Sequence, residues 1–300
     1  MSAHYGALDP DQRGRLLRLA AYASVGVALG LILLKGAVWT MSGSVSLLAS
    51  LIDSLMDAAA SLINLLAISF ALKPADKGHR FGHGKAEALA GLAQATFISV
   101  SAVLVFVQGV RRLLDPQPLD GAWLGVVVML ISIAATIGLL LVQRHVIQRT
   151  QSTAISADSL HYRSDLLLNA SIILALILAQ YGLVRADALF GLLIALYIGY
   201  SAVRIGLTAT QILMDHELPD EVRRQVLELA RAVPGVIGVH DLRTRQSGQH
   251  WFMQVHVELP AELSLTAAHE LGEAVRLAIV EAFPQTEVLV HKDPVKLDPQ

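Results

Sequence analysis

Four ionisable residues stand inside stretches that are otherwise apolar. Asp53 and Asp57 lie in SVSLLASLIDSLMDAAASLINLLAISFAL, residues 44–72, and His161 and Asp165 lie in a later apolar stretch. Each pair has a spacing of four, which on a helix places both side chains on one face, one turn apart. A carboxylate inside a bilayer is costly, so such residues usually face an interior cavity and serve a function. Carboxylates and an imidazole from two helices can together enclose one divalent cation.

Ionisable residues in apolar stretches can also have a purely structural role. A single histidine in an apolar helix is more often a hydrogen-bonded core residue than a ligand, but two matched pairs favour the metal site. Arg163 lies about 200° from His161 at helical pitch, so we expect it to point elsewhere. We expect Lys35, near the end of the first apolar stretch, to extend its ammonium toward lipid headgroups, with a functional role as the less favoured alternative.

Two further groups of histidines and aspartates lie in polar sequence. In the glycine-rich loop 73–85, Asp76, His79 and His83 have spacings that can gather on one cation, although a solvated turn is the favoured interpretation of this pattern alone. A single histidine of the polar tail, taken alone, is not expected to bind metal. The number of histidines in so small a domain nevertheless predicts a second metal site. Its candidate ligands are His240, His256, His269, His291 and Asp293.

The composition is that of a membrane protein. Of the 300 residues, 54% are hydrophobic and 16% are charged, whereas a soluble domain usually has about 25% charged residues. A spanning helix needs roughly 20 mainly apolar residues, and six stretches qualify: about 15–40, 44–72, 86–113, 120–144, 152–181 and 184–212. A net charge of −2 gives no field that would recruit nucleic acid. The absence of cysteine leaves histidine and carboxylates as the metal ligands.

The orientation in the membrane follows from the basic residues near the span ends. Arg13, Lys73 and Arg144 represent the more basic side, which is expected to face the cytoplasm. Both termini are therefore predicted to be cytoplasmic.

The character of the chain changes at Asp215, after which the sequence is that of a soluble domain. It predicts a helix, a β-hairpin turning at Ser247–Gly248, a second helix and a third strand. This order predicts a small α+β domain with both helices on one face of a three-stranded sheet. The predicted domains are residues 1–213 in the membrane and residues 214–300 as a cytoplasmic metal-binding domain.

Together these stretches resemble the cation diffusion facilitator family, and within it the bacterial zinc and iron exporters. The resemblance covers nearly the whole chain and is carried by LIDSLMDAAASLINLLA, PADKGHRFGHGKAEALA, LHYRSDLLLNA, PGVIGVHDLRTRQSG and VLVHKDP. It implies an all-α transmembrane domain of six helices followed by a ferredoxin-like α+β cytoplasmic domain. It also implies a multi-pass protein of the cell inner membrane that forms homodimers through its tail domains and membrane helices.

The resemblance further implies the roles of individual residues. Asp53, Asp57, His161 and Asp165 would form the transport site, and Asp76, His79 and His83 a second site in the loop. The tail would hold two metal ions through His240, His256, His269, His291 and Asp293. Lys85 and Asp215 match a charge interlock at the membrane–tail junction. Zn²⁺ is the expected ion, both transported and structural, with Cd²⁺ or Fe²⁺ as possible cargo.

The chemistry of the four ligands supports efflux in exchange for protons. Three carboxylates and one imidazole suit Zn²⁺, Cd²⁺ or Fe²⁺. Since these ligands bind metal only when deprotonated, protons and metal compete for one site, which alternating access converts into antiport. A metal-dependent intramembrane enzyme is an alternative, but the sequence has neither HExxH nor GxSxG. A metal sensor acting through the tail would leave the intramembrane carboxylates unexplained. We therefore predict a transporter and not an enzyme.

Overall fold

The computed structural model describes residues 9–42, 45–115, 123–179, 181 and 186–296. The chain divides into two compact units. One is helical and comprises residues 10–73 and 86–210. The other comprises residue 9, the loop of residues 74–85 and the tail of residues 211–296. The loop after the second predicted span therefore belongs with the tail, whereas the predicted domain boundaries place it with residues 1–213.

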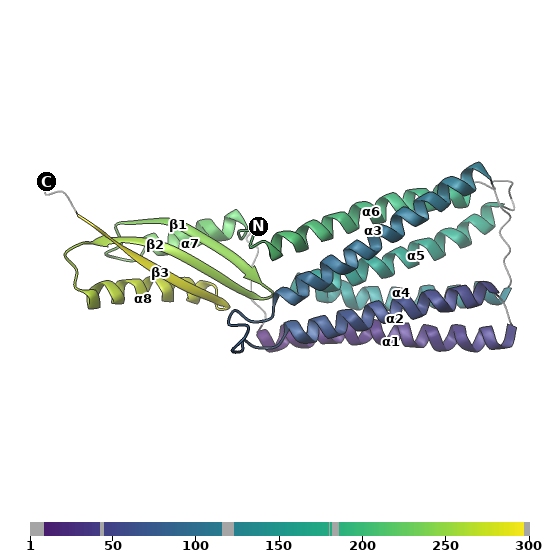
Figure 1. The fold of residues 1–300 in the computed structure, drawn as a ribbon, viewed down its shortest axis with the longest axis horizontal. Coiled ribbons are helices and arrows are strands. Elements are labelled where there is room, and N and C mark those ends of the chain that lie inside the picture. Colours follow the sequence, from purple (N-terminus) through teal and green to yellow (C-terminus); the bar gives the residue numbers. More distant parts are fainter. Residues whose placement is uncertain (1–8, 43–44, 116–122, 180, 182–185, 297–300) are drawn as a thin grey trace. The chain divides into compact units, whose positions relative to one another are not determined.

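The helical unit contains six long helices (Figure 1): α1 Pro10–Ser42, α2 Val45–Ala71, α3 Lys85–Leu114, α4 Trp123–Thr150, α5 Thr153–Ala179 and α6 Ala186–Leu213. Each overlaps one predicted span. Among the described residues, five of these helices are long and apolar enough to cross a membrane. The helix outside this set is α5, which carries Asp158, His161, Arg163 and Asp165.

Small apolar residues bring the helices together in two clusters. Leu17 and Ala21 of α1 pack with Ile68 of α2 and with residues of α4 and α5. In the other cluster, residues of α3 and α6 such as Ala102 and Ala202 pack around Leu160 of α5. Close packing of small side chains is the usual way membrane helices associate. Because α5 contributes to both clusters, its position is fixed from two sides.

The beginning of α5 is held by polar contacts from three other helices. Ser152 caps the helix, since its Oγ accepts a hydrogen bond of 3.2 Å from the Ile155 N–H. The Thr153 N–H donates to Glu87 Oε1 of α3 at 3.2 Å. Arg13 of α1 lies 3.7 Å from that carboxylate and donates to the carbonyl of Thr150 at the end of α4 at 3.0 Å. These contacts set the rotation of α5 just ahead of His161.

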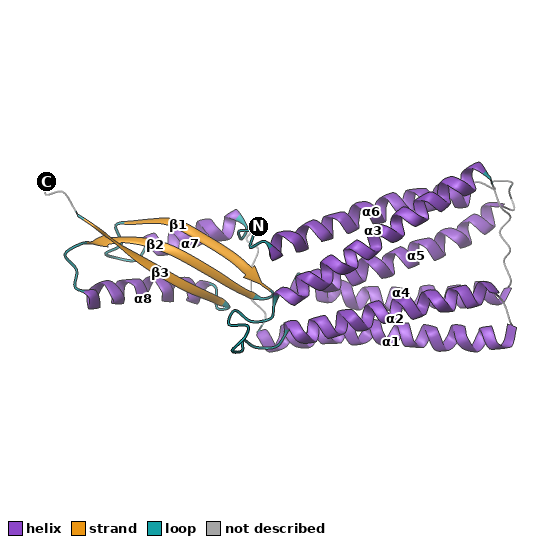
Figure 2. Cartoon of the chain, in the orientation of Figure 1, coloured by secondary structure: helices purple, strands orange, loops and turns teal. Residues whose placement is uncertain are grey.

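The tail has the predicted element order (Figure 2): α7 Asp220–Arg231, β1 Gly238–Ser247, β2 His250–Pro260, α8 Leu265–Ala282 and β3 Thr286–Val295. The sheet order is β1-β2-β3. Strands β1 and β2 are antiparallel, while β2 and β3 are parallel. The hairpin loop is Gly248–Gln249, one residue later than predicted, because Ser247 still pairs with His250. Gly248 adopts a φ of +61°, which favours glycine.

Both helices of the tail cover the same face of this sheet, as predicted. Val255 and Val257 of β2 are buried in one core with Val226 of α7 and Ile279 of α8. Since side chains alternate along a strand, the residues between them face the other side of the sheet. His256 lies on that second face, which places the histidines of the strands away from the helices.

Candidate metal centres

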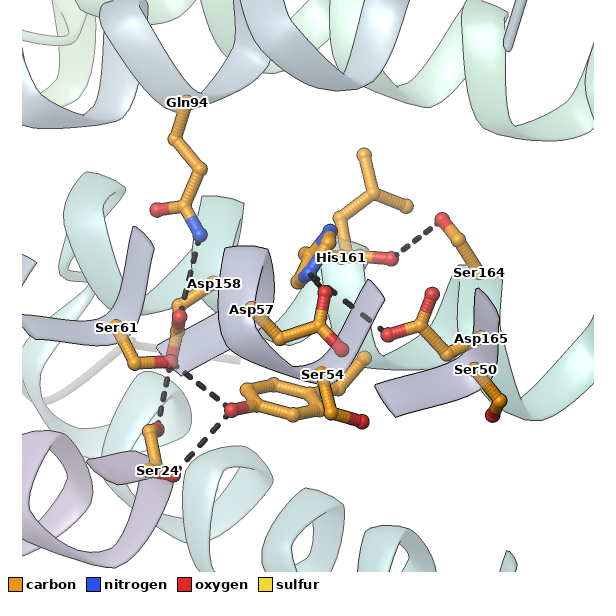
Figure 3. Close-up of polar contacts among 12 residues, drawn as sticks. Ser24, Ser50, Ser54, Asp57, Ser61, Gln94, Asp158, His161, Ser164 and Asp165 are labelled. Atoms are coloured by element: carbon orange, nitrogen blue, oxygen red, sulfur yellow. Dashed lines mark hydrogen bonds and ion pairs between the residues drawn. The ribbon is translucent and has the colours of Figure 1, made fainter. Parts of the chain in front are cut away.

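Three of the four predicted transport ligands converge in the helical unit (Figure 3). His161 Nε2 of α5 lies 2.9 Å from Asp57 Oδ1 of α2 and 3.8 Å from Asp165 Oδ2, one turn further along α5. One ligand atom from each residue lies within 4.8 Å of the others. This spacing matches the separation of ligand atoms around a single metal ion.

The three ligands line a cavity of about 530 Å³ within the helical unit. Asp53, one turn before Asp57, lines the same cavity but is not part of the three-residue cluster. Lys35 also lines it, and its Nζ donates to the carbonyl oxygen of Ser50 at 3.2 Å and to Ser54 Oγ at 2.7 Å. The prediction that Lys35 extends toward headgroups is therefore wrong, because these hydrogen bonds to α2 turn its ammonium into the cavity.

Asp158, one turn before His161 on α5, is a fully buried carboxylate that was not among the predicted site residues. It accepts hydrogen bonds from Ser24 Oγ of α1 at 2.6 Å, Gln143 Nε2 of α4 at 2.7 Å and Gln94 Nε2 of α3 at 3.1 Å. The sequence does show its partners Ser24, Gln94 and Gln143 as polar residues within three apolar spans. Such residues reveal a network only once the helices are placed side by side.

Tyr162 connects α5 to α1 and α2 by hydrogen bonds. Its side chain is almost fully buried, and its hydroxyl donates to the carbonyl oxygen of Ser24 at 3.2 Å and shares a hydrogen bond of 2.9 Å with Ser61 Oγ of α2. Asp158 and Tyr162 flank His161 in sequence, so both sides of this ligand are tied to neighbouring helices. Supporting hydrogen bonds of this kind hold a ligand in one geometry.

The loop residues Asp76, His79 and His83 also converge. His79 Nδ1 and His83 Nε2 each lie 3.4 Å from one oxygen of the Asp76 carboxylate. The backbone N–H of His79 donates to Asp76 Oδ1 at 2.7 Å and lowers the pKa of this carboxyl group. The carboxylate therefore stays ionised at neutral pH, as a metal ligand must.

This loop is docked on the β1–β2 hairpin of the tail, within the same unit. The ring of Phe81 lies edge-on to that of Phe252, with centroids 5.4 Å apart. The Arg245 guanidinium lies 4.4 Å from the Phe81 centroid and 5.0 Å from that of Phe252, within cation–π range. Gly84 approaches the backbone of Ser247 so closely that a Cβ would overlap its carbonyl oxygen.

The predicted interlock residues are in contact within this single chain. Lys85 Nζ lies 2.8 Å from Asp215 Oδ1 and donates to the carbonyl oxygen of Leu213 at 3.3 Å. Arg245 lies 3.6 Å from the other oxygen of Asp215. Asp215 therefore joins the start of α3 to the hairpin.

In the tail, strand register assembles the histidines. His240, His256 and His291 are direct neighbours in one row across β1, β2 and β3. Asp293, two residues along β3, lies 2.8 Å from His256, 3.3 Å from His240 and 3.2 Å from His291. The hydrogen bond from His256 lowers the pKa of Asp293, so this carboxylate is ionised at neutral pH.

Within this single chain, His240, His256 and Asp293 form a cluster that could bind one metal ion. His291 is not part of this cluster but contacts its Asp293. His269 lies on α8, on the helical side of the sheet, and is not part of this cluster. Sequence analysis missed two nearby carboxylates. Asp241 lies 3.7 Å from His256, at an irregularity of β1, and Glu258 lies 3.7 Å from His240.

Known proteins resemble the whole chain. Residues 21–214 match the family model described as the cation efflux transmembrane domain, and residues 218–295 match that of the cation efflux protein, cytoplasmic domain. The cation-efflux pump FieF of Klebsiella pneumoniae is 50% identical over 286 residues, covering 95% of each chain. FieF of Escherichia coli K12 is 48% identical over 287 residues, covering 96% of each chain.

A solved structure, a nickel form of the MamM CTD, is 30% identical and covers 26% of this chain and 100% of its own, with a TM-score of 0.25. The predicted resemblance to cation diffusion facilitators is confirmed by the two family matches and the two FieF relatives. With a transmembrane match over most of the helical unit and pumps as full-length relatives, this chain belongs to the cation efflux family of membrane transporters and is not an enzyme.

Proposed function

We propose that this protein exports divalent metal cations from the cytoplasm across the inner membrane in exchange for protons. Zn²⁺ is the favoured cargo, with Cd²⁺ or Fe²⁺ as further substrates. The observation that carries the proposal is the convergence of Asp57, His161 and Asp165 on one point of a cavity inside the residues matched as a cation efflux transmembrane domain. Asp53, on the wall of the same cavity, is the proposed fourth ligand.

The donor set supports both the cargo and the exchange. One imidazole nitrogen among carboxylate oxygens favours borderline cations such as Zn²⁺ over Mn²⁺ or Mg²⁺. The 2.9 Å hydrogen bond between His161 Nε2 and Asp57 Oδ1 joins two atoms that would both coordinate a bound cation. A proton shared by these atoms and a metal ion therefore exclude each other, which is the competition that antiport needs.

Six membrane crossings and two cytoplasmic termini complete this proposal. The 27-residue α5 follows α4 after a connection of two residues, Gln151 and Ser152, and packs against it. So short a connection makes α4 and α5 antiparallel neighbours over their length. His161 and Asp165 line the cavity and Asp158 lies in the buried network, whereas Arg163 is exposed. Placing three of these four residues among polar partners lowers the cost of putting this helix in a bilayer.

We further propose that the tail binds structural metal and pairs with the tail of a second copy. The His240–His256–Asp293 cluster offers ligands for one ion within a single chain. A second ion would need His291 and His269, which lie apart in this chain and would be supplemented by a partner subunit. The loop cluster of Asp76, His79 and His83 is the third proposed site.

Reconstitution into proteoliposomes tests the proposed function. Zn²⁺, Cd²⁺, Fe²⁺ and Mn²⁺ fluxes are measured with a pH gradient present or collapsed, while a dye reports the lumenal pH. We expect Zn²⁺ flux to be coupled to opposite proton movement and to exceed Mn²⁺ flux. Metal flux without any proton movement would contradict antiport. Metal binding without flux of any cation would favour a sensor.

A further inference from the structure

The cavity that holds the transport ligands also contains a positive charge from α1. Lys35 lines its wall, and both of its hydrogen bonds to α2 go to neutral oxygens, the Ser50 carbonyl and the Ser54 hydroxyl. Ser54 is buried and lies between Asp53 and Asp57 in sequence. The ammonium is thus fixed beside the ligand-bearing stretch of α2 (Figure 3 draws Ser50 and Ser54).

A lysine at this place must be balanced by the carboxylates around it, because an uncompensated charge inside a membrane protein is costly. Burial disfavours the Lys35 ammonium, and the carboxylates of Asp57, Asp165 and Asp53, which line the same cavity, attract it. The other basic residue of the cavity wall, Arg112, is exposed in the last turn of α3. Lys35 is therefore a cation that α1 contributes to the cavity of the ligand cluster.

The charges suggest a match to a divalent ion. Asp53, Asp57 and Asp165 supply three negative charges, and Lys35 reduces the sum to −2 when His161 is neutral. A cation of charge +2 then brings the site to zero. Without the lysine, the loaded site would keep a net charge of −1 in a region of low dielectric, and the same cation would be held more strongly.

We propose that Lys35 is a built-in counter-cation that sets the affinity and the release rate of the transport site. It stabilises the empty carboxylate cluster and repels the bound cation, so the metal is held loosely enough to leave. This inference rests on the proposed transport function. Lys35 does not coordinate the metal; it acts through the charge it places in the cavity that Asp57 and Asp165 also line.

The test compares the steady-state Zn²⁺ flux of the full chain with that of Lys35→Gln in proteoliposomes. Because repulsion between the ammonium and the divalent ion is lost, we expect KM to fall about tenfold. We expect kcat to fall as well, since release becomes slow. A variant that only disturbs the fold would raise KM or leave it unchanged.

Three controls make the outcome decisive. Lys35→Arg keeps the charge and should keep KM within about twofold. Lys73→Gln removes a charge from the end of α2, where Lys73 lies against the Phe70 ring, and should change neither constant. Lys35→Met replaces the glutamine variant if that one fails to fold, with the same expected fall in KM.

An unchanged or raised KM in a folded, charge-neutral variant would overturn the proposal. Asp57→Ala, measured alongside, separates this failure from failure of the proposed function. If Asp57→Ala abolishes flux while Lys35→Gln leaves KM unchanged, the transport site stands and only the role of Lys35 is refuted. If Asp57→Ala transports normally, the transport site itself is wrong, and the role of Lys35 is refuted with it.

Discussion

The cluster in the helical unit and the cluster in the tail use the same donors in different surroundings. Each combines histidine with aspartate within 4.8 Å. The His161 side chain is 12% exposed and is flanked by residues hydrogen-bonded to four other helices, whereas the His240 side chain is 48% exposed on an open sheet face. The first cluster is thus part of a polar network inside an apolar bundle, whereas the second lies on the sheet face opposite the hydrophobic core.

The difference teaches where each cluster obtains its stability. In the bundle, ligands and supporting residues must balance one another's charge, since an unpaired buried charge is strongly destabilising. In the tail, solvent screens the charges, and the α7–α8–sheet core lies on the opposite face. Substitutions in the bundle should therefore affect transport and folding, while substitutions in the tail should matter chiefly when metal is present.

The largest effect is expected from Asp57→Ala. This change removes the partner of His161 and a carboxylate of the cavity, so transport should be abolished. The protein should remain folded, because Asp57 is only half-buried and the hydrogen bonds to Asp158 come from Ser24, Gln94 and Gln143. Flux in proteoliposomes and size-exclusion chromatography check both statements. Wild-type flux in this variant would remove Asp57 from the site.

Asp158→Ala should instead weaken the fold. It removes the shared acceptor of Ser24, Gln94 and Gln143. Ser24 and Gln143 keep hydrogen bonds to the Ala20 carbonyl and to Ser24 Oγ, but a buried donor left unsatisfied costs about 1–3 kcal/mol. We expect a clear fall in melting temperature in detergent, with transport reduced because α5 loses its anchor. Asp158→Asn should lose less, since the amide oxygen can still accept. A melting temperature equal to that of the wild type would show that the network contributes nothing to stability.

His161→Asp should alter selectivity more than it alters total activity. A nitrogen ligand becomes an oxygen ligand, which favours Mn²⁺ relative to Zn²⁺ and Cd²⁺. Relative fluxes of the three cations in one preparation measure this change. If the ratios stay the same, His161 does not touch the transported ion.

The ligands of the bundle cluster were easier to predict from the sequence than the residues that surround them, Asp158 and Lys35. The spacing of four placed His161 and Asp165 on one face of α5, and the matching pair on α2 suggested that the two helices face each other. Asp158 and Lys35 depended on how α1, α3 and α4 are rotated against α5, and a single polar residue in an apolar span does not specify that rotation. The separation of Asp53 from the cluster was likewise not visible from spacing.

In the tail, element types and, to within one residue, the hairpin turn were predictable, but the metal cluster depended on register. His240, His256 and His291 form one row only because β3 pairs with β2 in parallel with residue 291 opposite residue 256. Strand patterns do not contain this pairing. The same limit explains why Asp241 and Glu258 were missed.

The smallest effect on transport is expected from the tail. Replacing both His240 and His291 by Ala removes two members of the histidine row but leaves the core behind it intact. Metal that binds only the folded tail stabilises it by mass action, about 2.7 kcal/mol at a concentration 100 times the Kd. The full-length variant should therefore lose most of its Zn²⁺-dependent rise in melting temperature, while its melting temperature in a chelator stays that of the wild type.

Transport by the double variant should be reduced but not lost, because the Asp57–His161–Asp165 cluster lies in the other unit and keeps all its ligands. The matched control is His216→Ala, an exposed tail histidine outside the row, which should keep the full Zn²⁺ response. Complete loss of flux in a folded, dimeric double variant would mean that the tail cluster is an obligatory station for the ion. The contrast between a transport cluster in the bundle and a stabilising cluster in the tail would then fail.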